Sequence, residues 1–328
     1  MQNPCENFRY LILFDRESEV GYRQRTVRES ISCTGIGLHS GKKVNLTIKP
    51  APPDSGIRFL RKDMPGRRTI KAHFENVVDT NMSTTIGSNG NKVSTIEHLM
   101  AAFFGCGIDN ALVELDGPEV PIMDGSSAPF IFLLKSAGIK EQKKPKEFIV
   151  IKKSLKIQEG SRSIFIKPSK ELKISFTVDF HHPLINKQKY ELRFSGKDFI
   201  TEISRARTFG FLQDIKALRD AGLAKGGSLD NAIVIDGFRV LNEDGLRYKD
   251  EFVRHKILDF IGDLAILGSP IIGHFHVQKS GHSLNQAMLK KLAANERYWK
   301  RLTIERPQEA TKESVKIPVF GQLEHVPA

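Results

Sequence analysis

The chain has 328 residues, 40% of them hydrophobic and 27% charged, and this composition excludes a largely disordered protein. The three cysteines are odd in number and widely spaced, which excludes a zinc knuckle and argues against a disulfide framework. The net charge of +12 is concentrated between residues 135 and 173, where twelve Lys or Arg face four acids. Because neither a basic stripe interleaved with aromatic residues nor a helix-turn-helix pattern accompanies this surplus, we expect no nucleic-acid partner and at most a weak association with membrane surfaces.

The N-terminal region carries no targeting or membrane signal. No apolar run approaches the roughly 18 residues that a membrane span needs. The apolar stretch over 10–14 is too short for a signal peptide, and charged residues follow it directly. We therefore expect a cytoplasmic monomer without a transmembrane segment, in which residues 1–24 form an N-terminal extension.

Residues 25–140 have the pattern of a first α+β domain. The expected elements are strands over 25–33, 43–49 and 110–115, a helix over 94–105, and an apolar segment over 129–134. Three glycines between the first two strands, Gly35, Gly37 and Gly41, resemble a dinucleotide-binding loop. Their spacing is wrong, and the next residues alternate like a strand instead of opening a helix, so a hairpin or wide loop is expected.

Residues 141–147 are polar, charged and interrupted by proline, which is typical of a linker between domains. Residues 148–300 then repeat the style of the first half as a second α+β domain, and 301–328 follow as a C-terminal tail. The expected elements are strands over 148–157, 163–168, 173–179, 189–194, 232–235 and 274–277, and helices over 211–220, from about 250, and over 283–300. Two similar domains, each with helices packed on a sheet, predict a site in the cleft between them.

The expected helix after residue 250 carries the first candidate site residues. His255, Asp259 and Asp263 are spaced four residues apart, so their side chains share one face of the helix. An imidazole and a carboxylate one turn apart form a metal-ligand pair. A charged face exposed to solvent explains the same spacing, so a third ligand and a base are needed to decide.

Glu97 and His98 open the helix expected over 94–105 and offer a general base and a ligand. Ser94 and Glu97 also match a capping box, in which the glutamate has only a structural role. His282 follows a late strand in a loop, where functional residues concentrate, although a lone surface histidine fits there too.

Taken together, these residues resemble the UDP-3-O-acyl-N-acetylglucosamine deacetylase family of lipid A biosynthesis. The resemblance runs in order through roughly residues 25–300. Its segments are TGIGLHSG (34–41), STIEHL (94–99), GIDN (107–110), EVPIMDGS (119–126), ARTFG (206–210), GGSLDNA (226–232), HKILDFIGDL (255–264) and Gly281-His282. The series is far more specific than any one motif, although the family usually lacks the N-terminal extension and a linker as basic as this one.

The resemblance implies a role for each matching residue. His98, His255 and Asp259 would hold one catalytic Zn²⁺, with the fourth position left for water. Glu97 would act as general base, and His282 as the cationic acid oriented by Asp263. Other matching residues would serve the reaction or the substrate: Thr208 would steady the oxyanion, and Lys256, Phe209 and His39 would bind the UDP-linked amino sugar.

Lys256 stands one residue off the ligand face of its helix, so we expect it to reach along the cleft and not toward the metal. The resemblance also implies that the segment 212–235 forms a passage for the acyl chain. The competing hypotheses are an unrelated metal-dependent hydrolase without that passage, and a basic protein that binds nucleic acid or anionic membranes through structural histidines. Iron is chemically acceptable at a site of two histidines and one aspartate.

Overall fold

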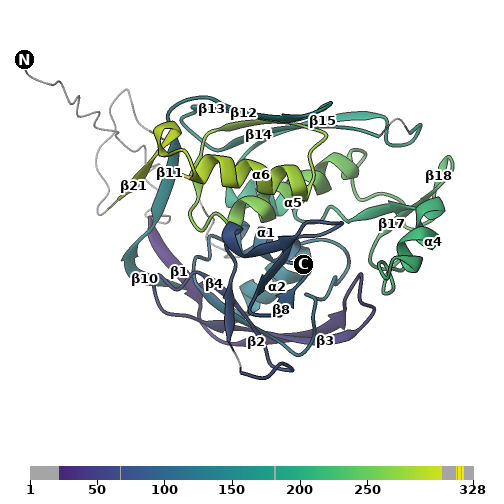
Figure 1. The fold of residues 1–328 in the computed structure, drawn as a ribbon, viewed down its shortest axis with the longest axis horizontal. Coiled ribbons are helices and arrows are strands. Elements are labelled where there is room, and N and C mark those ends of the chain that lie inside the picture. Colours follow the sequence, from purple (N-terminus) through teal and green to yellow (C-terminus); the bar gives the residue numbers. More distant parts are fainter. Residues whose placement is uncertain are drawn as a thin grey trace, which may run out of the picture.

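The computed structural model describes residues 22–66, 68–180, 182–304, 315, 317, 318 and 320. The predicted N-terminal extension therefore lies outside the described residues, except for 22–24. Within the described part, no helix is long and apolar enough to cross a membrane. The predicted α+β class is confirmed: helices and several separate sheets make two halves (Figure 1).

The first half is built on a five-stranded sheet. Its strands are β2 (Ile31–Ile36), β3 (Lys43–Pro50), β4 (Ile57–Arg61), β5 (Thr69–Lys71) and β9 (Ala111–Leu115). The order is β2-β3-β9-β4-β5, with β9 antiparallel to β3 and parallel to β4. Alternate residues are buried along β3 and β9, as expected for strands with one face on a core. Helices α1 (Glu97–Cys106) and α2 (Ala128–Ala137) pack in this half.

The second half repeats this topology strand for strand. Its sheet contains β12 (Leu155–Glu159), β13 (Arg162–Lys167), β14 (Lys173–Asp179), β15 (Lys187–Arg193) and β20 (His274–Gln278). The order is β12-β13-β20-β14-β15, and the late strand β20 is again antiparallel to one neighbour and parallel to the other. Helix α5 (Glu251–Ala265) precedes β20 as α1 precedes β9, and α6 (His282–Ala293) follows it as α2 follows β9. The similar build expected of the two halves is thus present.

Smaller sheets extend and connect the halves. One contains β6 (Val77–Asp79), β7 (Thr85–Ser88) and β8 (Asn91–Val93), and another contains β16 (Phe209–Phe211), β17 (Ile233–Asp236) and β18 (Arg239–Val240) beside α4 (Leu212–Asp220). The β17–β18 and α4 unit projects at the right of Figure 1. Strand β1 (Arg23–Val27) pairs with β10 (Ile139–Pro145), and β11 (Glu147–Ile151) pairs with β19 (Ile271–Ile272) and β21 (Trp299–Thr303). Short helical turns are α3 (Gly196–Asp198), a π-helix (Phe199–Ile203), and 3₁₀ turns at Phe74–Asn76 and Glu296–Tyr298.

The two halves meet where α1 packs against α5, between the two sheets (Figure 1). Gly262 marks the closest approach: a Cβ at this position would lie 2.1 Å from the carbonyl oxygen of Glu97. No side chain fits there, so the backbone of α5 touches the first residue of α1. Side chains on the two helices near this point are consequently brought together from different halves.

Several predicted boundaries are wrong for local reasons. The strand expected over 25–33 is two strands, β1 and β2, in different sheets, and the one over 148–157 is likewise divided into β11 and β12. The helix expected over 94–105 begins at Glu97 and passes through Gly105, where a Cβ would lie 2.1 Å from the Phe199 ring. It ends instead at Cys106, and Gly107 after it, with a φ of 67°, supplies the left-handed cap.

The segments expected to form a linker and a C-terminal tail both contribute to strands. The predicted linker, 141–147, lies largely in β10 and is paired with β1. The predicted tail, 301–328, begins inside β21, and Phe320 is buried among Phe104 and Phe194. The helix expected over 283–300 ends at Ala293 because the chain then enters a 3₁₀ turn and β21. The domain boundaries themselves stay a prediction.

Candidate metal centre and active site

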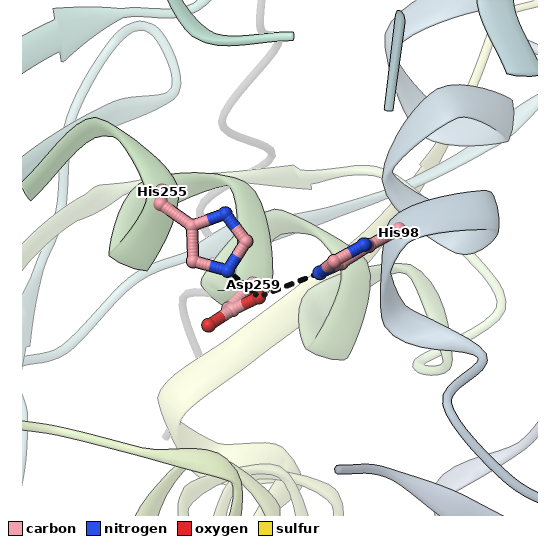
Figure 2. A group of neighbouring side chains, drawn as sticks. All are labelled: His98, His255 and Asp259. Atoms are coloured by element: carbon pink, nitrogen blue, oxygen red, sulfur yellow. Dashed lines mark ion pairs between the residues drawn. The ribbon is translucent and has the colours of Figure 1, made fainter. Parts of the chain in front are cut away.

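Three buried side chains from the two halves converge at the α1–α5 contact. His98 comes from α1, and His255 and Asp259 come from α5 (Figure 2). Asp259 Oδ1 lies 3.4 Å from His98 Nε2 and 3.2 Å from His255 Nε2. All three ligand atoms lie within 4.8 Å of one another, and each residue is at most 4% exposed. Two imidazole nitrogens and one carboxylate oxygen are the donor set of a catalytic metal site with one position left open.

The protonation states of this cluster fit metal binding. Burial lowers the pKa of His255, which favours the neutral imidazole that a metal requires. His255 Nδ1 lies 3.1 Å from the carbonyl oxygen of Ala206, so Nδ1–H donates there and Nε2 keeps its lone pair for the site. Burial alone would raise the pKa of Asp259, but His255 and Lys256 outweigh it and hold that pKa well below its usual range. Asp259 is therefore a carboxylate.

Beside this cluster runs a second row of buried groups, Glu97, His282 and Asp263. Nδ1 of His282 lies 2.9 Å from Asp263 Oδ2, and its Nε2 lies 3.9 Å from Glu97 Oε1. Asp263 also accepts hydrogen bonds from Thr84 Oγ1 at 2.5 Å and from Asn285 Nδ2 at 2.7 Å. These contacts fix the carboxylate of Asp263, which in turn orients the ring of His282.

The capping-box interpretation of Glu97 is wrong. Helix α1 has Ile96 at its N-cap with no side-chain hydrogen bond, whereas Ser94 pairs through its backbone with Glu119. Glu97 Oε2 instead accepts the N–H of Thr84 at 3.0 Å. The structural role that competed for Glu97 is therefore absent, and Oε1 faces His282.

The pKa values of Glu97 and His282 are both raised above their usual values. Burial raises the pKa of Glu97 to about 7, with His282 opposing and Asp259 and Asp263 adding to the effect. For His282, burial alone would lower the pKa, but the carboxylates of Asp263 and Glu97 outweigh it and raise the value to about 9. At neutral pH the site thus holds a cationic imidazole next to a carboxyl group close to its own midpoint, an arrangement suited to general acid–base chemistry.

The remaining candidate residues differ in how closely they approach the cluster. The Phe209 ring lies 6.1 Å from that of His255, and Lys256 Nζ lies 5.7 Å from the Phe209 ring centre. Lys256 Nζ also lies 2.6 Å from Asp259 Oδ2. The expectation that Lys256 reaches away from the metal ligands is therefore wrong, because its position three residues before Asp259 on α5 places it beside that carboxylate.

His39 lies near the site, whereas the contacts of Thr208 are with Gly125 and Ile233. The pKa of His39 is lowered by burial and further by the nearby His282 and His98, with Glu119 opposing. Its Nε2 is buried and has no hydrogen-bond partner among the described residues. Thr208 stands directly before β16, and its backbone N–H donates to the carbonyl of Gly125. No hydrogen bond of its hydroxyl is found in the described part of the chain, so its predicted role stays a prediction.

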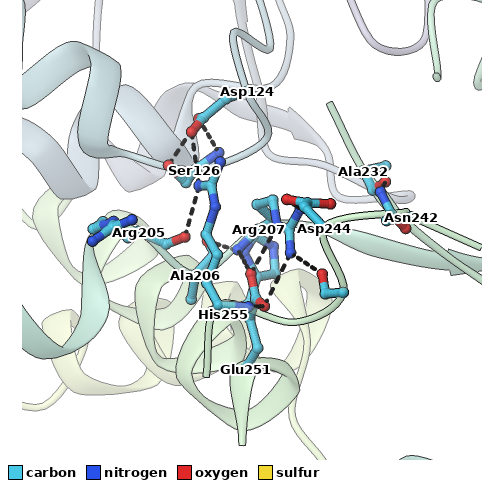
Figure 3. Close-up of polar contacts among 12 residues, drawn as sticks. Asp124, Ser126, Arg205, Ala206, Arg207, Ala232, Asn242, Asp244, Glu251 and His255 are labelled. Atoms are coloured by element: carbon cyan, nitrogen blue, oxygen red, sulfur yellow. Dashed lines mark hydrogen bonds and ion pairs between the residues drawn. The ribbon is translucent and has the colours of Figure 1, made fainter. Parts of the chain in front are cut away.

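A buried ion pair between Arg207 and Glu251 holds the chain segment whose carbonyl contacts His255 (Figure 3). Arg207 donates from Nε to Glu251 Oε1 at 3.0 Å, and its backbone N–H donates to the same oxygen. Arg207 is 2% exposed and Glu251 is fully buried. The residue before Arg207 is Ala206, whose carbonyl accepts from His255. The ion pair therefore fixes the segment that sets the orientation of this ligand, and the sequence reasoning missed it.

A cavity of about 530 Å³ lies at the other end of the α1–α5 pair. Met100, Phe104 and Gly107 line it from α1 and its cap, and Lys146 and Phe320 contribute from more distant segments. None of the candidate catalytic or ligand residues lines this cavity. It is therefore distinct from the candidate site.

The fold and site define an α+β protein with two repeated halves and a buried His–His–Asp triad, a candidate metal site, shared between them. The family model described as UDP-3-O-acyl N-acetylglycosamine deacetylase matches residues 24–294, and the chain belongs to this family.

Curated relatives named UDP-3-O-acyl-N-acetylglucosamine deacetylase are similar over most of their length. The chain is 53% identical to that of Myxococcus xanthus over 274 residues, which cover 84% of this chain and 87% of the relative. It is 54% identical to that of Acidithiobacillus ferrooxidans over 279 residues, covering 84% and 92%. It is 51% identical to that of Teredinibacter turnerae over 296 residues, covering 90% and 98%.

Proposed function

We propose that the chain is a zinc-dependent amidohydrolase that converts UDP-3-O-acyl-N-acetylglucosamine and water to UDP-3-O-acyl-glucosamine and acetate, the committed step of lipid A biosynthesis. The observation that carries this proposal is the meeting of His98 with His255 and Asp259, next to Glu97 and His282. Membership of the deacetylase family and the names of the relatives support the substrate.

His98, His255 and Asp259 are the residues that would hold the metal. When bound at such a site, a zinc ion acidifies water and polarises an amide carbonyl, which makes hydrolysis feasible near neutral pH. The neutral His255 and the ionised Asp259 are already in the protonation states that ligands need. Iron is an alternative ion for the same donor set.

Glu97 is the general base of the proposed reaction. Its Oε2 is held by the N–H of Thr84, so Oε1 is the oxygen that takes the proton from the attacking water. A carboxyl group with a pKa of about 7 releases and accepts a proton with little free-energy change at neutral pH. The water oxygen then adds to the carbonyl carbon of the acetamide.

His282 is the general acid. With a pKa of about 9 it carries a proton on both ring nitrogens at neutral pH. Nδ1–H is bonded to Asp263, and Nε2–H is directed toward the side where Glu97 lies. In the proposed reaction the cation stabilises the developing oxyanion, together with the hydroxyl of Thr208. It then protonates the amine as the carbon–nitrogen bond breaks, and acetate and the free amine result.

Substrate binding is assigned to groups around the triad. Lys256 and Phe209 on one side and His39 on the other would contact the sugar and its diphosphate. The segment 212–235, with α4, would receive the acyl chain through apolar residues such as Ile215 and Leu218. A cytoplasmic location stays a prediction from the sequence.

Acetate release from UDP-3-O-acyl-N-acetylglucosamine, measured before and after chelation, tests the proposal. We expect activity to fall to background with a chelator and to return on adding one equivalent of Zn²⁺. Acetate release that persists without metal would exclude the metal-dependent mechanism. No release in any state, together with salt-sensitive binding to nucleic acid or anionic vesicles, would instead support the binding-protein hypothesis.

A further inference from the structure

The glycine-rich segment 37–41 wraps around the carboxylate of Glu119. The backbone N–H of His39 donates to Glu119 Oε1 at 2.9 Å, and that of Ser40 donates to Oε2 at 2.8 Å. Consecutive backbone amides turned toward one point form an anion-binding nest, a device that in other proteins receives phosphate. Here the anion belongs to the protein itself. A Cβ on Gly37 would lie 2.4 Å from Glu119 Oε2, so glycine is needed for the carboxylate to enter.

Glu119 also contacts the segment that leads into α1. Its Oε1 accepts a third hydrogen bond, from Thr95 Oγ1, at 2.9 Å. Thr95 has a φ of 57°, a left-handed conformation that a β-branched residue rarely adopts. Such a conformation persists only where surrounding contacts impose it, and Glu119 supplies one of them. Thr95 stands two residues before Glu97.

The glycine-rich segment 37–41 also contacts the second half of the protein. The N–H of Gly226 donates to the carbonyl of Leu38 at 3.0 Å, and that of Lys225 donates to the carbonyl of His39 at 3.3 Å. A Cβ on Gly226 would lie 2.3 Å from the carbonyl oxygen of Gly37. The segment that carries His39 is therefore held by Glu119 on one side and by the 224–226 turn on the other.

The burial of Glu119 makes its hydrogen bonds necessary. The residue is 1% exposed, and among the described residues its carboxylate forms no ion pair with Lys or Arg. A buried anion without a cation depends on its hydrogen-bond donors. Two of the three donors are the amides that shape the His39 segment, so losing the carboxylate releases that segment first.

We propose that Glu119 is a positioning residue that, through the amides of His39 and Ser40, holds His39 at the edge of the active site and thereby sets the affinity for the UDP-sugar substrate. Its effect on substrate rests on the proposed function. His39 is suited to this role because its Nε2 is buried but has no partner among the described residues. The glycine spacing that excluded a dinucleotide loop thus has a different purpose, which is to build a nest for an internal carboxylate.

We call the contacts of Glu119 with the amides of His39 and Ser40 the clamp. The substitution Glu119→Gln tests it, because the side-chain amide keeps one acceptor oxygen and turns an NH₂ donor toward the second backbone N–H. The matched control is Glu114→Gln, which removes the charge of another glutamate in the same half that pairs with Lys49 at 2.8 Å. Hydrogen–deuterium exchange of the peptide covering 37–41, zinc content, KM and kcat are measured for both variants and the parent. A milder variant, Thr95→Val, removes one donor and leaves the charge of Glu119 in place.

For Glu119→Gln we expect exchange over 37–41 to accelerate at least about tenfold, KM to rise about tenfold, and kcat to change less than about threefold, with zinc content unchanged. Thr95→Val should change exchange and KM in the same direction but less, and it decides the matter if the glutamine variant does not fold. A merely structural role for Glu119 would lower thermal stability and leave KM at the value of the Glu114→Gln control, which would overturn the proposal. If the parent releases no acetate, the proposed function fails. The positioning role of Glu119 is then tested by hydrogen–deuterium exchange over 37–41 alone, compared between the parent and the variants.

Discussion

Nδ1 of His282 lies 2.9 Å from Asp263 Oδ2, while Nε2 of the same ring lies 3.9 Å from Glu97 Oε1. One carboxylate stands behind the imidazole and the other in front of it. The two together raise the pKa of His282 to about 9 although the ring is buried. This pairing makes the site dependent on pH in a direction that can be measured.

Activity should fall as the pH rises through about 9, because the proposed acid His282 is protonated below that value and loses its proton above it. Asp263→Asn removes a carboxylate that raises this pKa, whereas the burial that lowers it remains. The alkaline limb of kcat/KM should therefore move to lower pH in the variant. The limb is located from initial rates between pH 6 and 10, and a limb that stays at its position in Asp263→Asn would show that another group controls it.

Replacing the proposed base should remove catalysis and keep the metal. We expect Glu97→Ala to lower kcat by roughly 10²–10⁴-fold, the usual contribution of a general base. Bound zinc, measured by elemental analysis, should stay at one ion per chain, since Glu97 is not among the three clustered ligand residues. A folded, zinc-loaded variant as fast as the parent would contradict the assignment.

Removing one proposed ligand should instead lower the zinc content of the protein. His98→Ala takes away the one proposed ligand that the first half contributes, so the zinc content of the purified protein should drop well below that of the parent. The substitution His274→Ala, on the central strand β20 of the second sheet, serves as a histidine control. Equal zinc content in His98→Ala and the control would exclude His98 as a ligand.

The ion pair between Arg207 and Glu251 should contribute to stability mainly by avoiding an unpaired buried charge. Arg207→Met leaves the fully buried Glu251 without its cation, which should cost roughly 3–5 kcal/mol of unfolding free energy. The double variant Arg207→Met with Glu251→Gln neutralises that charge and should recover part of the loss. Chemical denaturation measures both, and a double variant no more stable than Arg207→Met alone would contradict this account.

The sequence predicted the candidate site better than it predicted the strands. The spacing of His255, Asp259 and Asp263 survives folding because a helix fixes which side chains share a face, and α5 begins one residue after the expected start at Asp250. The convergence with His98 and His282 did not follow from spacing. It was implied by the resemblance to a family, and the contacts between α1, α5 and α6 that create it are distant in sequence.

What the sequence missed depends on tertiary contacts. Thr84 and Asn285 bind Asp263 without belonging to any recognisable motif. Strands such as β1 and β2 were merged because their apolar pattern continues across a turn, and only their partners distinguish them. His274 and His276 alternate with buried residues along β20. Residues two apart in a strand share a face, and both rings lie half-buried, 3.9 Å apart.

Gly262 has a mechanical consequence for the metal centre. Because the backbone of Glu97 leaves no room for a side chain at Gly262, the backbones of α1 and α5 approach each other directly beside His98, and this approach brings His98 close to His255 and Asp259 on α5. The relative placement of the three residues, which come from both halves, thus depends on a glycine that is not itself one of them.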